Sequence, residues 1–100
     1  MSKPDRTISQ SQRREMIRRG HDLRAQTTLG RQGLTDAFVT QLDQTMRKCD
    51  LLKVRVDADS GPDATSLAES LARRIGGELI QRVGRVALIY RPIIETDDNE

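Results

Sequence analysis

One hundred residues, of which 23 are Leu, Ile, Val or Phe, are enough for one folded domain with a modest core and leave little room for a second. The single cysteine excludes an internal disulfide and a multi-cysteine metal site, and without a run of about 18 apolar residues or a signal-peptide pattern we expect no membrane span and a cytoplasmic location. The net charge is only +2, but residues 1–55 carry 12 basic and 6 acidic side chains, whereas residues 56–100 carry 5 and 9.

This uneven distribution of charge predicts one basic flank. Four acidic residues lie in the last six positions, and without them the chain carries +6. We interpret residues 94–100 as a flexible acidic tail, residues 1–7 as a flexible start and residues 8–93 as the domain. A basic surface on a small domain is typical of nucleic-acid binding, and an ordinary solvated surface is the alternative interpretation.

The first predicted element is a helix over residues 9–23. Met16, Gly20 and Leu23 recur at helical spacing and form a narrow inner face, while arginines occupy much of the remaining surface. A glycine inside a helix costs about 1 kcal/mol relative to alanine. We therefore expect Gly20 to pack closely against a neighbouring element.

A glycine-bounded loop follows a short predicted strand at residues 27–29. Its sequence is Gly30-Arg31-Gln32-Gly33, in which the glycines allow a sharp turn and close approach, and Arg31 adds a mobile cation. Thr35 predicts the N-cap of the next helix, whose N–H groups and positive dipole end point at the loop. A phosphate backbone could bind there. The alternative is that the glycines only end a strand and permit a turn.

The second predicted helix runs to about Lys48, because apolar residues form one stripe along it. The members of this stripe are Leu34, Phe38, Leu42, Met46 and Cys49. Residues 51–56 then alternate as a strand, with one buried face and a partly basic outer face that carries Lys53 and Arg55.

The last third of the chain predicts a turn, a helix and a hairpin. Residues 57–63 form the turn, marked by Gly61-Pro62, and apolar spacing then indicates a helix over residues 64–75. Strands at 78–83 and 86–91 are joined by a two-residue turn, and the continuous apolar run of the last strand favours a central position. The order α-β-α-β-α-β-β predicts a single compact α/β domain with a mixed four-stranded sheet.

Residues suited to catalysis are few. His21 is the only histidine and Cys49 the only thiol, and no partner can be named for either, so we interpret His21 as structural or RNA-facing and Cys49 as core filler. No cluster has metal-ligand spacing, and we expect no metal, no cofactor and no enzymatic activity. With Phe38 and Tyr90 as the only aromatic residues, binding through phosphates and shape is favoured over base stacking, which suits structured RNA.

Several segments in a fixed order resemble the chloroplast RNA splicing and ribosome maturation (CRM) domain family, and its bacterial YhbY-like RNA-binding proteins in particular. The resemblance covers about residues 8–92. The segments that carry it are Gln12-Arg13-Arg14, His21-Asp22-Leu23, Gly30 to Asp36, Leu51 to Val56, Val83-Gly84-Arg85 and Tyr90-Arg91-Pro92.

This resemblance implies a fold similar to the C-terminal domain of bacterial translation initiation factor three, and no catalysis. It implies binding to precursor ribosomal RNA of the large subunit during assembly, where other assembly factors are candidate partners. We expect the protein to be a monomer. The glycine loop corresponds to the family's Gly-x-x-Gly loop, and the first helix and basic strand complete the surface. The residues expected to contact RNA are Gly30, Arg31, Gln32, Gly33, Arg13, Arg14, Arg18, His21, Lys53, Arg55 and Arg85.

Two other functions stay open at this point. The acidic tail and modest net charge are compatible with a protein–protein interaction module that has no nucleic-acid partner. A small enzyme that uses His21 or Cys49 is the third hypothesis, and substitution of either residue by alanine would then abolish activity.

Overall fold

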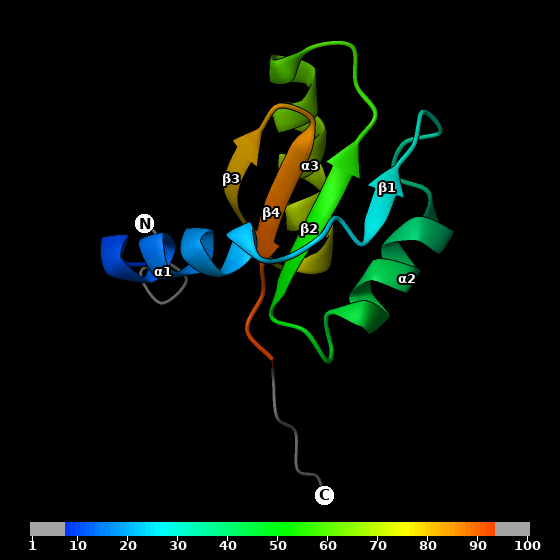
Figure 1. The fold of residues 1–100 in the computed structure, drawn as a ribbon. Helices are drawn as coiled ribbons and strands as arrows, with labels where there is room; N and C mark the ends of the chain where they lie inside the picture. Colours follow the sequence, from blue (N-terminus) through cyan, green and yellow to red (C-terminus); the bar gives the residue numbers. More distant parts are fainter. Residues whose placement is uncertain (1–7, 94–100) are drawn as a thin grey trace, which may run out of the picture.

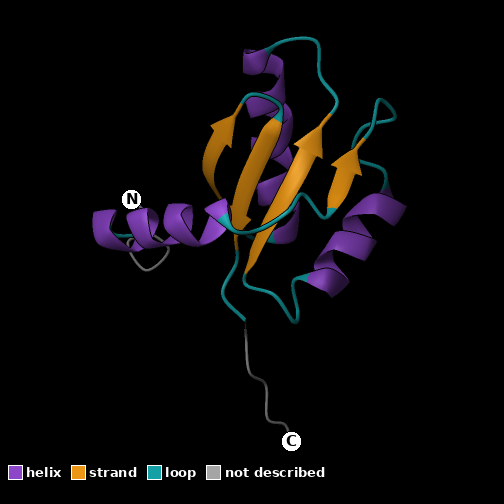
Figure 2. Ribbon diagram, in the orientation of Figure 1, coloured by secondary structure: helices purple, strands orange, loops and turns teal. Residues whose placement is uncertain are grey.

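The computed structural model describes residues 8–93, and the segments 1–7 and 94–100 that we predict to be flexible lie outside them (Figure 1). The order of elements is the predicted one, and the bounds are α1 Gln10–His21, β1 Thr27–Leu29, α2 Asp36–Thr45, β2 Leu51–Val56, α3 Gly61–Ile75, β3 Glu78–Val83 and β4 Val86–Tyr90. Figure 2 shows three layers, with α1 across one face of the sheet and α2 and α3 on the opposite face.

The sheet is mixed, as the sequence predicts. Its strand order is β1-β2-β4-β3, with β1 and β2 parallel and the other two pairs antiparallel. The apolar strand β4 therefore lies inside the sheet, and β1 and β3 are its edges. A register shift between Leu79 and Gln81 interrupts the pairing of β3 with β4. The carbonyl of Ile80 at this irregularity accepts a hydrogen bond from Arg13 Nη1 at 2.8 Å. A side chain of α1 thus supplies the donor that the pairing of β3 with β4 does not give to this carbonyl.

Side-chain caps fix where the helices begin. The hydroxyl of Thr35 accepts the N–H of Phe38 at 3.1 Å and caps α2, as predicted. Ser60 caps α3 in the same way, so Gly61 and Pro62 are the first residues of that helix. Our prediction of a turn extending to residue 63 was wrong here. The fixed φ of proline suits the first turn of a helix, where its missing N–H would have had no intrahelical acceptor.

The helix α2 ends earlier than its apolar stripe suggests. It stops at Thr45, because the N–H groups of Arg47 and Lys48 bond to carbonyls three residues back rather than four. Our prediction of a helix to about Lys48 was therefore too long. Cys49 lies beyond the helix, is only partly buried and belongs to neither apolar cluster, so its interpretation as core filler was also wrong.

Two apolar clusters, one on each face of the sheet, form the core. The larger cluster lies between the sheet and the helices α2 and α3. The smaller cluster lies on the opposite face and joins Met16 of α1 to Leu51, Ile80 and Leu88. Leu51 is thus buried under α1 instead of lying on an open outer face as predicted. A Cβ placed on Gly20 would come within 2.9 Å of Leu88 Cδ2, which is the close packing that the mid-helix glycine predicts.

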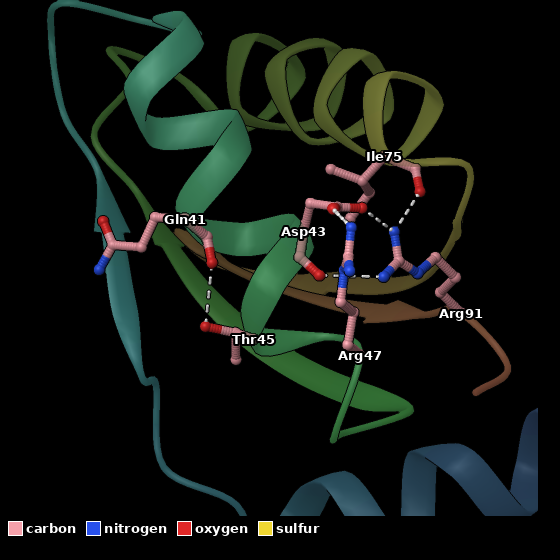
Figure 3. A network of polar contacts seen from close by, with 6 residues as sticks. All are labelled: Gln41, Asp43, Thr45, Arg47, Ile75 and Arg91. Atoms are coloured by element: carbon pink, nitrogen blue, oxygen red, sulfur yellow. Dashed lines mark hydrogen bonds and ion pairs between the residues drawn. The ribbon is translucent and has the colours of Figure 1, made fainter. Parts of the chain in front are cut away.

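A polar network joins the C-terminal ends of α2 and α3 to the segment after β4 (Figure 3). Arg91 Nη1 lies 2.6 Å from Asp43 Oδ1 and donates to the carbonyl of Ile75 at 2.8 Å, while Nη2 donates to the carbonyl of Asp43 at 3.1 Å. The hydrogen bond from Arg91 is the main cause that holds the pKa of Asp43 below its usual value, and the neighbouring Arg47 contributes. The network closes the end of the core that is opposite the glycine loop.

Candidate nucleic-acid interface

The glycine loop is a tight turn at the end of β1. The N–H of Gly33 donates to the carbonyl of Gly30 at 3.0 Å, and Gly33 has a φ of +84°, which only glycine adopts at little cost. Gly30 has no such requirement, and a Cβ added there would only touch Gln32 Oε1 at 3.4 Å. Among residues 8–93, the N–H groups of Arg31 and Gln32 have no acceptor, so they are available to an external anion.

Arg31 is held by two carboxylates, which corrects our prediction of a mobile cation. Its Nε lies 3.1 Å from Asp57 Oδ1 and its Nη1 lies 2.8 Å from Asp59 Oδ1. The hydrogen bond to Asp59 is the main cause that raises the pKa of Arg31 above its usual value. The side chain of Arg31 remains 63% exposed, and such exposed ion pairs contribute little free energy. An external phosphate can therefore compete for this arginine.

Parallel pairing explains why these residues meet. Leu29 of β1 pairs with Val56 of β2, and the N–H of Asp57 donates to the carbonyl of Leu29 at 2.9 Å. The C-terminal ends of the two strands lie together, and so do the loops that follow them. We had interpreted Asp57 and Asp59 only as turn formers. The signal that could have identified them was two acidic residues directly after a strand parallel to the one before the glycine loop.

Arg85 positions this acidic turn and is not a free surface cation. From the β3–β4 turn its Nε donates to the carbonyl of Ala58 at 2.9 Å and its Nη2 donates to the carbonyl of Asp59 at 3.0 Å. The side chain is partly buried. Two of its donors are thus taken by backbone carbonyls, which gives Arg85 a positioning role, and its contact with RNA stays a prediction.

Some basic side chains of α1 already have hydrogen-bond or ion-pair partners, and others have none among the described residues. Arg13 is bonded to Ile80 and lies 4.0 Å from Glu78, and Arg18 pairs with Glu15 on its own helix. Arg14 and His21 are exposed and have no hydrogen-bond or ion-pair partner among the described residues. The predicted surface of α1 is therefore available at Arg14 and His21, and only in part at Arg18.

The two basic residues of β2 also differ from one another. Lys53 donates through Nζ to the carbonyl of Leu23 at 3.1 Å, so it anchors the segment between α1 and β1. Arg55 is exposed, and its side chain has no hydrogen-bond or ion-pair partner within residues 8–93. The structure thus places Arg55 next to the glycine loop, at the same end of the sheet, while Arg14 lies on the helix that crosses the other half (Figure 1).

Within residues 8–93, no helix is long and apolar enough to cross a membrane. No group of three or more His, Cys, Asp or Glu side chains in that range could hold a metal ion.

These features define a small α/β domain with a glycine-bounded, arginine-bearing turn at one end of a mixed sheet. The chain belongs to the CRS1/YhbY (CRM) domain family, whose model matches residues 8–91. A solution structure of a Staphylococcus aureus protein proposed to bind RNA superposes with a TM-score of 0.76 at 28% identity, over 94% of this chain and 95% of the other. The fold is therefore the predicted one, while the likeness to initiation factor three stays a prediction.

Two curated relatives extend the comparison. A "probable RNA-binding protein" of Pseudomonas aeruginosa is 26% identical over 84 residues, which are 84% of this chain and 81% of the relative. A "probable RNA-binding protein" of Bacillus subtilis is 24% identical over 84 residues, which are 84% of this chain and 88% of the relative. These names point to a class of RNA-binding proteins and not to enzymes.

Proposed function

We propose that this protein binds structured RNA through its sugar–phosphate backbone, with the Gly30–Gly33 turn as the centre of the contact. The observation that carries this proposal is the pair of N–H groups on Arg31 and Gln32 that have no acceptor among the described residues, in a turn where Gly30 leaves room for close approach. The RNA-binding relatives support the same class of partner.

The surroundings of the turn fit a polyanion. Arg55 at the end of β2 and Arg14 on α1 are exposed and unpaired among the described residues, so neither must leave a protein carboxylate to meet a phosphate. Arg31 must exchange Asp57 and Asp59 for phosphate oxygens, and the exposed position of this pair makes that exchange inexpensive. Affinity should therefore fall steeply as salt rises.

We further propose that the RNA is precursor ribosomal RNA of the large subunit and that the protein acts as a monomeric cytoplasmic assembly factor without catalytic activity. This part depends on the family resemblance, since the contacts of residues 8–93 do not distinguish one folded RNA from another. Crosslinking in cells followed by sequencing tests it directly. Enrichment of precursor large-subunit RNA supports the proposal, and recovery of unrelated transcripts alone would contradict it.

Binding to RNA itself is tested by titrating a fluorescent hairpin RNA from the large subunit at several salt concentrations. Gly30→Asp places a carboxylate in the turn without a backbone penalty, because Gly30 does not have a positive φ. Ser66→Asp on the exposed surface of α3 adds the same charge on the other side of the sheet and serves as the matched control. We expect Gly30→Asp to lower affinity by about tenfold or more and Ser66→Asp to change it little. Equal effects of the two variants would remove the loop from the mechanism.

A further inference from the structure

One row of side chains crosses all four strands beside the glycine loop. The register pairs Thr28 with Arg55, Arg55 with Val86, and Val86 with Val83, so these four residues lie side by side on the same face of the sheet. This is the face that α1 covers elsewhere. At about 4.8 Å between strands, the row spans about 14 Å from Thr28 to Val83.

The row lies on the part of the sheet face that α1 does not cover, directly beside the part that it does. Gly20 of α1 lies on Leu88, and the segment after α1 is held over Lys53 by the bond to the carbonyl of Leu23. Leu88 and Lys53 are register partners, and they form the next row toward α1. Beyond them Thr28 and Arg55 are exposed and Val86 is partly buried. Figure 1 shows this upper half of the sheet face without a helix in front of it.

Val83 is an apolar side chain in an unusually exposed position. It is 64% exposed, and among residues 8–93 only one other large apolar side chain is exposed, that of Ile93 at 45%. Single exposed apolar residues are common on proteins. Val83 differs because Val86 lies beside it and an unpaired guanidinium lies one strand further along the same row. The result is a surface with an apolar end, a planar cation and a hydroxyl.

The border of the row is also suited to RNA. Arg19 of α1 bonds to Asp50, which precedes β2, so this flank of the helix faces away from the row. Residues two positions away on a helix lie on nearly the opposite side, which turns His21 toward the row. At the other border, Gly30 follows Thr28 by two positions, so the phosphate site proposed above lies within about one nucleotide of Arg55.

We infer that the row Thr28–Arg55–Val86–Val83 receives an unpaired RNA base next to the phosphate held by the glycine loop. This inference rests on the proposed function. Arginine planes stack on bases as aromatic rings do, which supplies a stacking partner in a protein with only two aromatic residues. The valines cover the apolar part of the base, and the hydroxyl of Thr28 lies at the end of the row nearest the phosphate.

The test compares two RNA hairpins that differ by one base. One carries a single bulged uridine, and the other carries an abasic ribose at the same place, so both have the same charge. We expect the wild-type protein to bind the uridine hairpin about tenfold more tightly. Arg55→Gln and Val83→Thr should each reduce this preference to near onefold, while Arg73→Gln, which removes an exposed charge from α3, should leave it unchanged.

The outcomes separate this inference from the proposed function. If the preference for uridine persists in both row variants, or if the wild type shows none, the inference is overturned, and the loop proposal still stands as long as Gly30→Asp weakens binding. If the wild type binds neither hairpin at low salt, both are overturned. Because Val83 and Arg55 are exposed, neither substitution removes a buried contact, and circular dichroism is expected to show an unchanged fold.

Discussion

Among residues 8–93, Arg91 and Asp43 form the closest ion pair between distant parts of the chain, with 2.6 Å between Nη1 and Oδ1 (Figure 3). The side chain of Arg91 is only 14% exposed, and its other donors meet the carbonyls of Ile75 and Asp43. One guanidinium therefore supplies the positive charge that the C-terminal ends of both α2 and α3 favour.

Removal of this guanidinium should destabilise the fold. We expect Arg91→Met, which keeps the length of the stem, to lower the free energy of unfolding by about 1–3 kcal/mol, because two backbone carbonyls lose their donors. The free energy of unfolding of Arg91→Lys should lie between those of this variant and the wild type, because lysine keeps the charge but lacks the planar, several-donor guanidinium group. Urea denaturation measures the difference. A loss as large in Arg47→Met, whose side chain is 72% exposed, would contradict the assignment.

The same pair predicts a loss of stability in acid. The pKa of Asp43 is lower in the folded protein than in the unfolded chain, chiefly because of Arg91, so the unfolded chain binds the proton first. The contribution of Asp43 is fully present above the ordinary carboxyl range and disappears as the pH falls through its folded pKa. Thermal unfolding from pH 7 to pH 2 should show a smaller decline for Asp43→Asn than for the wild type. Parallel curves would contradict this prediction.

Release of Arg31 should strengthen RNA binding. Asp59→Asn removes the carboxylate that lies 2.8 Å from Arg31 Nη1, and it also removes a negative charge that repels phosphate. We expect affinity for the hairpin RNA to rise several-fold at low salt, with the gain shrinking as salt increases. Glu69→Gln removes the same charge from the exposed surface of α3 and is the control. Equal gains in both variants would show a general charge effect only.

The two glycines of the loop should respond differently to alanine. Gly33→Ala forces a Cβ into a left-handed conformation and should cost about 1–2 kcal/mol of stability. Gly30→Ala meets only Gln32 Oε1 at 3.4 Å and should leave stability unchanged while it weakens RNA binding. Chemical denaturation and the RNA titration report these effects separately. A stable Gly30→Ala variant with full affinity would mean that the RNA does not approach Gly30.

The close packing of Gly20 against Leu88 predicts that replacing this glycine by a larger residue lowers stability. Gly20→Ala gains about 1 kcal/mol of helix propensity but forces buried Leu88 to move, a change that costs about 1–3 kcal/mol. We expect a net destabilisation of about 1 kcal/mol in urea. Leu88→Ala creates space, so Gly20→Ala should be neutral or stabilising in that background. Additive effects of the two substitutions would show that the residues do not meet.

Local patterns were sufficient for most of the architecture. The cap at Thr35, the end of α3 at Ile75 and the turn at Gly84-Arg85 each depend on residues close in sequence, and each was predicted. The central position of β4 followed from its continuous apolar run. Errors arose where local signals compete, as at Gly61-Pro62, since the same dipeptide suits a turn and the first turn of a helix.

The candidate site was harder to predict, because its contacts join distant residues. Arg31 meets carboxylates 26 and 28 positions away, and Arg85 meets carbonyls 27 and 26 positions away. A sequence indicates that such arginines are charged, but not which of their donors are already occupied. The open row beside Arg55 is of the same kind, since it exists only through the register of four strands and the position at which α1 ends.

The strand that carries the glycine loop is three residues long and pairs with a single neighbour, yet its last residue, Leu29, is completely enclosed by the core. Leu29 therefore anchors the start of the glycine loop. Because the turn leaves the sheet at a fully buried residue, the position of its free N–H groups depends on a contact of the core.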